Sequence, residues 1–236
     1  KQKHNNIRLI KCSVNKGCYY SKNIGLNNIS KDTKYIFFQD SDDFSYSSRI
    51  EKQVNFMEKK RVVVTGLGAL TPLGNTVDTY WDNLLAGKSG ADYITKFDAS
   101  LFKTQFACEV KGFNPLDIMD RKEVRKLDLF SVYAMATTKE AFKDSKINLE
   151  TVNLDRAGVV WGSGIGGMKT FQEECFNYKD GDGSPRFNPF FVPKMIVDIA
   201  AGHISIKYGL KGPNYVTVSA CASSTNAIID ALMLIQ

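Results

Sequence analysis

The chain has 236 residues, of which 43% are hydrophobic, so it can bury a core as one large domain or two modest ones. Its net charge is +6, but the basic excess lies in residues 1–57, where ten Lys and Arg accompany five Asp and Glu. The remaining residues carry no basic footprint for a nucleic acid, and we expect none as a partner.

Cysteine usage and hydropathy narrow the class of protein further. The five cysteines form no CxxC pair and have no histidine at ligand spacing, which argues against a disulfide framework or a zinc site. A reducing, cytoplasmic location fits this pattern best. No apolar run approaches about 18 residues, so we expect neither a membrane span nor a signal peptide.

Residues 34–44 join an apolar, β-prone run to a cluster of acidic residues, Asp40, Asp42 and Asp43. A strand that ends in carboxylates can hold a hard divalent cation through oxygen, and such a cation can neutralise a diphosphate. The alternative is a solvated turn after an edge strand. Four words of this front segment resemble the middle of a family 2 glycosyltransferase: Asn15–Gly17, Ser21–Leu26, Phe37–Asp43 and Arg49–Phe56.

This resemblance implies that Asp40 and Asp42 would bind the metal of a nucleotide-sugar. It covers only about 55 residues, which is too little chain to bury the core of a transferase, so we expect the segment to be catalytically silent. We place the domain boundary between residues 56 and 57, because the sequence after Met57 reads as a fresh start. This fresh start indicates a fusion or a gene-model artefact, and no linker rich in Pro, Gly or Ser separates the parts.

Strands and helices alternate from residue 57 onward, which predicts an α/β fold with a mostly parallel central sheet between helices. Periodicity and capping residues indicate the elements. In chain order we expect a buried strand from residue 61 that breaks into a Gly-rich turn, a helix over 75–86 closed by Gly87, a helix over 120–144, a strand over 157–161, a turn-rich segment over 188–193, a helix over 196–208 ended by Gly209, and a strand over 216–218.

The last strand leads directly to Cys221, and from Ala222 onward the apolar spacing becomes helical. A cysteine at the start of a helix lies beside unsatisfied backbone N–H groups and the positive end of the helix dipole. Both stabilise a thiolate, which is the nucleophilic form, and the same N–H groups can hold an oxyanion. The alternative is an inert, buried cysteine that acts as a small hydrophobe.

Gly162, Gly164 and Gly167 form a GxGxxG word after a strand and before a helix, the context of a dinucleotide-binding fingerprint. A nicotinamide-nucleotide oxidoreductase is therefore a rival hypothesis. Such a site also needs an acidic residue at the end of the next strand, whereas Asp180 and Asp182 lie in a loop rich in glycine and proline. The alternative role of the glycines is a tight turn.

Six words occur in the order of the β-ketoacyl-acyl-carrier-protein synthase family, particularly its elongating synthase II type. They are Val62–Gly68, Trp161–Gly167, Asn188–Pro193, Ala201–Ser205, Tyr208–Pro213 and Val218–Ser224. The resemblance runs over residues 57–236. It implies the first, N-terminal half of a thiolase-like fold, which in this family is usually paired as a homodimer and needs no cofactor.

The resemblance also implies roles for individual residues. Cys221 would take an acyl group from acyl carrier protein as a thioester, and its own N–H would be one of two oxyanion donors. Ile165 and Phe191 match positions that line the acyl-chain pocket; ordinary core packing is the alternative. Acyl carrier protein would be the partner, as acyl-ACP and malonyl-ACP. The basic residues that could dock it, or simply form a solvated helix face, are Lys122, Arg125 and Lys126.

The implied reaction is a decarboxylating Claisen condensation that lengthens a fatty acyl thioester. In the family it also needs two His, one Lys and a Gly-Phe loop from the second half, which would lie beyond Gln236. Of the two histidines present, His4 belongs to the front segment, and we expect His203 to be a satisfied core histidine. We therefore expect this stretch alone to lack condensing activity. A non-catalytic fusion product remains the alternative to a synthase fragment.

Overall fold

The computed structural model describes residues 62–235 together with positions 26, 27, 29, 30, 32, 48 and 51. The chain divides into two units, residues 1–61 and 62–236, and the fold below is that of the second unit. Asp40 and Asp42, with their predicted metal site, lie outside the described residues. The boundary between residues 56 and 57 stays a prediction.

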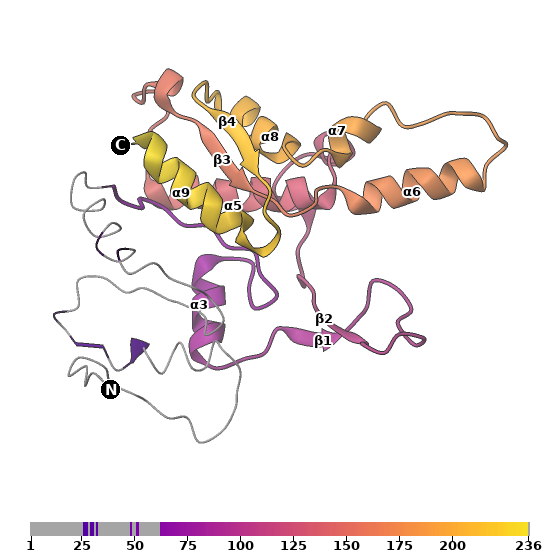
Figure 1. The fold of residues 1–236 in the computed structure, drawn as a ribbon, viewed down its shortest axis with the longest axis horizontal. Coiled ribbons are helices and arrows are strands. Elements are labelled where there is room, and N and C mark those ends of the chain that lie inside the picture. The colour runs from indigo at the N-terminus through magenta and orange to yellow at the C-terminus, as the bar shows by residue number, and fades with distance from the viewer. Residues whose placement is uncertain are drawn as a thin grey trace. The chain divides into compact units, whose positions relative to one another are not determined.

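Helices and strands alternate along the second unit (Figure 1). In chain order they are α3 (Val77–Leu85), β1 (Ala91–Tyr93), β2 (Phe106–Cys108), η1 (Pro115–Asp117), α4 (Arg121–Val124), α5 (Leu129–Ser145), η2 (Leu154–Arg156), β3 (Val159–Gly162), α6 (Met168–Lys179), α7 (Phe191–Met195), α8 (Ile199–Tyr208), β4 (Asn214–Thr217), η3 (Ala220–Ala222) and α9 (Ser223–Ile235), where η denotes a 3-10 helix. In the part of the chain that the structure describes, no helix has the length and apolarity that crossing a bilayer requires.

The centre of the unit is the parallel pair β3–β4, in which Val159 lies opposite Asn214 and Gly162 opposite Thr217. Helices α5 and α8 pack together against one face of this pair, and α9 covers the other face (Figure 1). Strands β1 and β2 form a separate antiparallel pair. The arrangement confirms the predicted α/β class with a parallel sheet between helices.

The hydrophobic core lies between β3, α5 and α8. Val132 and Met135 of α5 pack with Ala200, Ala201 and Ile204 of α8. Ala200 and Ala201 are fully buried, and such small side chains let two helices approach each other closely. This packing fixes α8, and with it the strand β4 that follows.

The expected helix over 120–144 is interrupted, and Asp128 is the physical reason. Helix α4 ends at Val124, and α5 begins after Asp128, whose carboxylate accepts a hydrogen bond from the N–H of Phe130. The other carboxylate oxygen of Asp128 accepts bonds from the N–H and the hydroxyl of Thr170, at 3.2 and 2.5 Å. A buried aspartate that satisfies these donors holds the non-helical backbone of an N-cap, so one predicted helix becomes two.

The prediction of a buried strand from residue 61 is wrong. Residues 62–70 form no strand, and the side chains of Val63 and Val64 are 57% and 80% exposed. Backbone N–H groups of the segment donate to carboxylates of α5 instead of to another strand: Leu67 to Asp144 and Ala69 to Glu140. A β-branched run becomes a strand only where a neighbouring backbone accepts its hydrogen bonds, and this segment uses side-chain acceptors.

Several local predictions are confirmed. Helix α3 is capped by the side chain of Thr76 and is followed by Gly87 at φ +67°. Helix α8 ends at Gly209, also left-handed at φ +69°, although it begins at Ile199 and not at residue 196. The turn-rich segment over 188–193 leads into the short helix α7.

Candidate active site

Cys221 lies in the 3-10 turn η3, between the end of β4 and the start of α9, and its side chain is exposed. This is the strand-to-helix junction that the apolar pattern predicted. The 13 residues of α9 align their backbone dipoles, which places partial positive charge at the end of the helix next to the sulfur.

The turn that carries Cys221 is strained and is held by one buried side chain. Ala220 adopts φ +49°, a left-handed conformation that costs a non-glycine residue about 1–2 kcal/mol. Ser223, only 3% exposed, accepts a hydrogen bond from the N–H of Ser219 at 2.9 Å. Its hydroxyl donates to the carbonyl of Ala220 at 2.7 Å. Ser223 therefore closes the turn from inside.

Sequence reasoning missed this role of Ser223, because it treated the small polar residues after Cys221 as filling for a first helical turn. A usable signal was present. A serine just inside a predicted helix can bond the backbone of the preceding turn.

The backbone N–H of Cys221 is a donor of this turn without an acceptor among the described residues. The N–H of Ala222 donates to the carbonyl of Ser219, and that of Ser223 donates to the carbonyl of Ala220. The N–H of Cys221 itself donates no hydrogen bond to any of the described residues. An unpaired donor next to a nucleophilic sulfur is the group that could hold an oxyanion.

The glycine word packs against this turn. A Cβ at Gly162 would lie 2.6 Å from backbone atoms of Ser223 and Ser224 in α9, so only glycine fits there. The next residue, Ser163, donates its N–H to the carbonyl of Thr217 at the end of β4. Gly166 has φ +93°, and a Cβ there would lie 2.6 Å from the carbonyl oxygen of Met195. These glycines serve close backbone packing.

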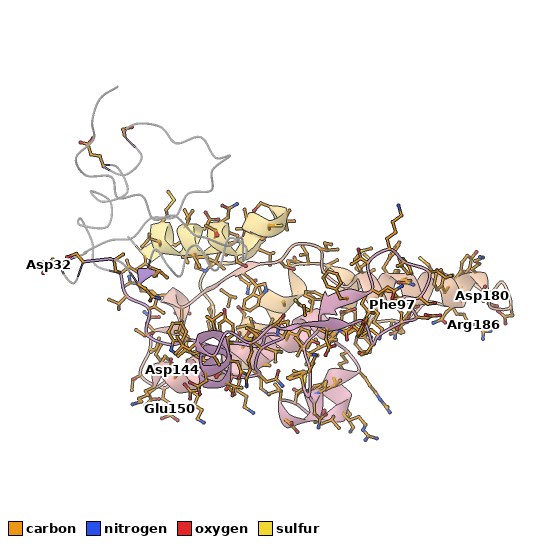
Figure 2. All side chains as sticks on the ribbon, turned by 90° about the horizontal axis from the view of Figure 1, so that it is seen from below. Asp32, Phe97, Asp144, Glu150, Asp180 and Arg186 are labelled. Atoms are coloured by element: carbon orange, nitrogen blue, oxygen red, sulfur yellow. The ribbon has the colours of Figure 1, made fainter. Side chains whose placement is uncertain are left out.

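The same geometry counts against a dinucleotide fingerprint. Asp180 stands at the far end of α6, twelve residues or about 18 Å of helix from the glycine word. Helix α6 and the segment that returns from it project as an arm, and Asp180 and Arg186 lie at its tip (Figure 2). An acidic residue there cannot reach a ribose bound at the start of the helix.

Ile165 lines a cavity of about 450 Å³ between the glycine word, α6 and α7, together with Phe171 and Met195. Ile165 is 71% exposed. Phe191 is next to this cavity, because its ring stacks on that of Phe171 with the centroids 6.2 Å apart. Cys221 is not among the residues that line the cavity. The structure thus brings Ile165 and Phe191 to one apolar region, and the glycine word joins that region to the cysteine turn.

His203 corrects one expectation. Its Nε2 atom is buried, and no hydrogen-bond partner for it exists among the described residues, so it is not a satisfied core histidine. Burial lowers the pKa of the imidazole below its ordinary 6.5, because desolvation disfavours the charged form. Within the described residues, no group of three His, Cys, Asp or Glu side chains is placed to hold a metal ion.

The three basic residues singled out in the sequence, Lys122, Arg125 and Lys126, are exposed on α4 and just after it. The Nζ atom of Lys126 lies 5.8 Å above the centroid of the Phe190 ring, at the start of α7.

Solved structures share this fold. A β-ketoacyl synthase from Burkholderia phymatum matches with a TM-score of 0.64 and 28% identity, over 75% of this chain and 43% of that one. A type II polyketide ketosynthase, in complex with its acyl-carrier protein, matches with a TM-score of 0.62 and 22% identity, over 75% of this chain and 47% of that one. The class of protein is therefore defined: an α/β chain with the N-terminal half of the thiolase-like ketosynthase fold.

Residues 59–236 match the model of the β-ketoacyl synthase N-terminal domain, and the chain belongs to the β-ketoacyl synthase family. Curated relatives include 3-oxoacyl-[acyl-carrier-protein] synthase 2 of Staphylococcus aureus, 46% identical over 179 residues, and that of Synechocystis sp., 45% identical over 180 residues. Each alignment covers 76% of this chain and 43% of the relative, so the chain spans less than half the length of these relatives.

The front of the chain matches a second family model. Residues 1–109 match glycosyl transferase family 2, in agreement with the resemblance of the first 56 residues. The two matches overlap over residues 59–109, and residues 62–109 of this overlap belong to the second structural unit.

Proposed function

We propose that this chain carries the acyl-accepting half of a 3-oxoacyl-[acyl-carrier-protein] synthase and takes part in fatty-acid chain elongation. The observation that carries the proposal is the exposed Cys221 at the start of α9, with its own backbone N–H unpaired among the described residues. The identity of 46% with synthase 2 of Staphylococcus aureus supports the reaction class.

In the proposed reaction, the Cys221 thiolate attacks the carbonyl carbon of an acyl thioester on acyl carrier protein. The C–S bond between the acyl group and the carrier breaks, the carrier sulfur takes up the proton that the Cys221 thiol gave up, and the acyl group stays on Cys221 as a new thioester. Malonyl-ACP then loses CO2, and its carbanion attacks the acyl-cysteine carbonyl. The product is a 3-oxoacyl-ACP two carbons longer, and the cysteine is released. The N–H of Cys221 stabilises the oxyanion formed in each attack.

The remaining assignments follow the family resemblance. Ile165 and Phe191 contact the acyl chain, since the cavity beside them is apolar and open at the surface. The exposed basic residues Lys122, Arg125 and Lys126 dock acyl carrier protein, an acidic partner. The printed description of one fold relative, a ketosynthase in complex with its acyl-carrier protein, supports this kind of partner. The protein acts in the cytoplasm and as a homodimer.

The proposal is tested by intact-mass spectrometry of the 236-residue chain incubated with octanoyl-ACP. We expect a single octanoyl adduct that disappears in Cys221→Ser and persists in Cys108→Ser and Cys175→Ser. These two are matched controls, because both cysteines are exposed like Cys221. An adduct that survives Cys221→Ser, or no adduct at all, would overturn the proposal and favour a non-catalytic fusion product.

Condensation is measured separately by adding malonyl-ACP to the octanoylated chain. We expect no 3-oxodecanoyl-ACP above the control without enzyme, because the family draws its two His and one Lys from the second half of the fold. A rate above that control would contradict the assignment of those groups.

A further inference from the structure

A second cavity lies on the other side of the sheet from α9, between α5, α8 and the segment around α4. Its volume is about 320 Å³, at the lower end of the range for small-molecule sites. Its wall is largely apolar and includes Met119, Leu127 and Met135. None of its lining residues belongs to the cysteine turn or the glycine word, so it is separate from the proposed acyl-transfer site.

The imidazole ring of His203 is part of the wall of this cavity. The buried Nε2 of that ring has no partner among the described residues. That nitrogen is covered by protein atoms, so a ligand in the cavity contacts the imidazole through the exposed edge of the ring.

Cationic side chains surround the same cavity. Lys126, Lys139 and Lys207 line it, against the single carboxylate of Glu123. Lys207 and Glu123 form an exposed ion pair at 3.8 Å, which leaves two lysines without an acidic partner there. Lys207 is one helical turn beyond His203 on α8, and Lys139 is one turn beyond Met135 on α5, so the charges follow the inner wall at helical spacing.

We propose that this cavity binds a medium-chain carboxylate. The carboxylate lies between Lys139 and Lys207, where it competes with Glu123 for the exposed Lys207 ammonium, and the hydrocarbon chain packs against Met119, Met135 and the ring of His203. The volume suits a ligand of roughly ten non-hydrogen atoms, such as octanoate. Charge complementarity selects an anion over a neutral or cationic amphiphile of the same length.

The test is a calorimetric titration of the 236-residue chain with octanoate, compared with octanol and octylammonium. We expect saturable binding of octanoate that weakens at least tenfold in Lys139→Glu and in Lys207→Glu. Lys143→Glu is the matched control, because Lys143 is exposed on the same helix as Lys139 but does not line this cavity. Its affinity for octanoate is expected to stay within twofold of the parent chain. Octanol and octylammonium are expected to bind at least tenfold more weakly.

A second readout follows the imidazole directly. In a His4→Gln background His203 is the single histidine, so octanoate is expected to shift one imidazole nitrogen resonance in step with the calorimetric isotherm. Binding that is equal in Lys139→Glu and Lys143→Glu, or an unmoved His203 resonance at saturation, would overturn the proposal. Loss of octanoate binding in Ile165→Asp with no change in Lys139→Glu would do so too, because it would place the ligand in the acyl-chain cavity. None of these outcomes depends on acylation of Cys221, so the two proposals fail separately.

Discussion

Replacement of Gly162 by alanine tests whether the glycine word exists for backbone packing. The new Cβ would lie 2.6 Å from the carbonyl carbon of Ser223 and from the N and Cα atoms of Ser224. Carbon atoms pack at about 3.5–4.0 Å, so the overlap is roughly 1 Å and involves only backbone, which cannot rotate away. Overpacking of this kind costs about 3 kcal/mol, at the upper end of its usual range. That corresponds to a fall in Tm of roughly 6–12 °C for a domain of this size.

Gly164→Ala is the matched control for this prediction. Its Cβ would meet only the carbonyl oxygen of Ala220, at 3.9 Å, which is ordinary van der Waals contact. We expect its free energy of unfolding to lie within about 0.5 kcal/mol of the parent value. The assay is urea unfolding followed by circular dichroism, with the octanoyl-adduct rate measured on the same samples. Equal stability of the Gly162→Ala and Gly164→Ala variants would refute the packing argument.

Three further predictions concern polar groups that are buried or partly buried. Asp128→Ala leaves both donors of Thr170 without their buried acceptor and is expected to lower the free energy of unfolding by about 3 kcal/mol. Asp120→Ala, at an exposed N-cap, is expected to lower it by about 1 kcal/mol. Similar losses for the two variants in urea unfolding would contradict the argument that the buried carboxylate matters more. Glu140→Gln is expected to lower the free energy of unfolding by about 1–3 kcal/mol. The two carboxylate oxygens accept backbone N–H groups of the 62–77 segment at 2.8 Å each, and an amide supplies only one acceptor. An unchanged free energy of unfolding would show that other contacts hold this segment. The free energy of unfolding is expected to fall as the pH drops below about 6.5, by up to about 1.4 kcal/mol per pH unit, because the unfolded chain protonates His203 at a higher pH than the folded chain does. His203→Gln is expected to remove this pH dependence. An unchanged pH profile of stability in that variant would show that other groups cause the dependence.

Elements governed by near neighbours in the sequence were predictable. The caps of α3 and α8 depend on residues within one turn. Thr76 caps the start of α3 with its side chain, and Gly87 and Gly209 follow the ends of α3 and α8 in the left-handed conformation that glycine tolerates. The strand-to-helix position of Cys221 followed from a change of apolar period over about ten residues. In each case the deciding contact is local, so one sequence contains enough information.

Features that depend on distant partners were not predictable. The break between α4 and α5 comes from Asp128 bonding to Thr170, a residue on another helix. The absence of a strand over residues 62–70 depends on carboxylates of α5 that accept its N–H groups. The cavity around His203 draws its wall from two regions far apart in the sequence, residues 118–139 and 203–208, and no spacing rule connects them. The unpaired Nε2 was visible only in three dimensions.

The cysteine turn and the glycine word act as one mechanical unit, and this governs how substitutions affect chemistry. The left-handed Ala220 is held by the two hydrogen bonds of Ser223, each worth about 1 kcal/mol, so the strain of the turn is offset locally. Ser223 keeps its place only because Gly162 lets the backbone of α9 approach β3 closely. The glycine word then continues to Ile165, which lines the apolar cavity. A side chain at position 162 therefore displaces both the sulfur and the cavity wall, whereas a side chain at 164 displaces neither.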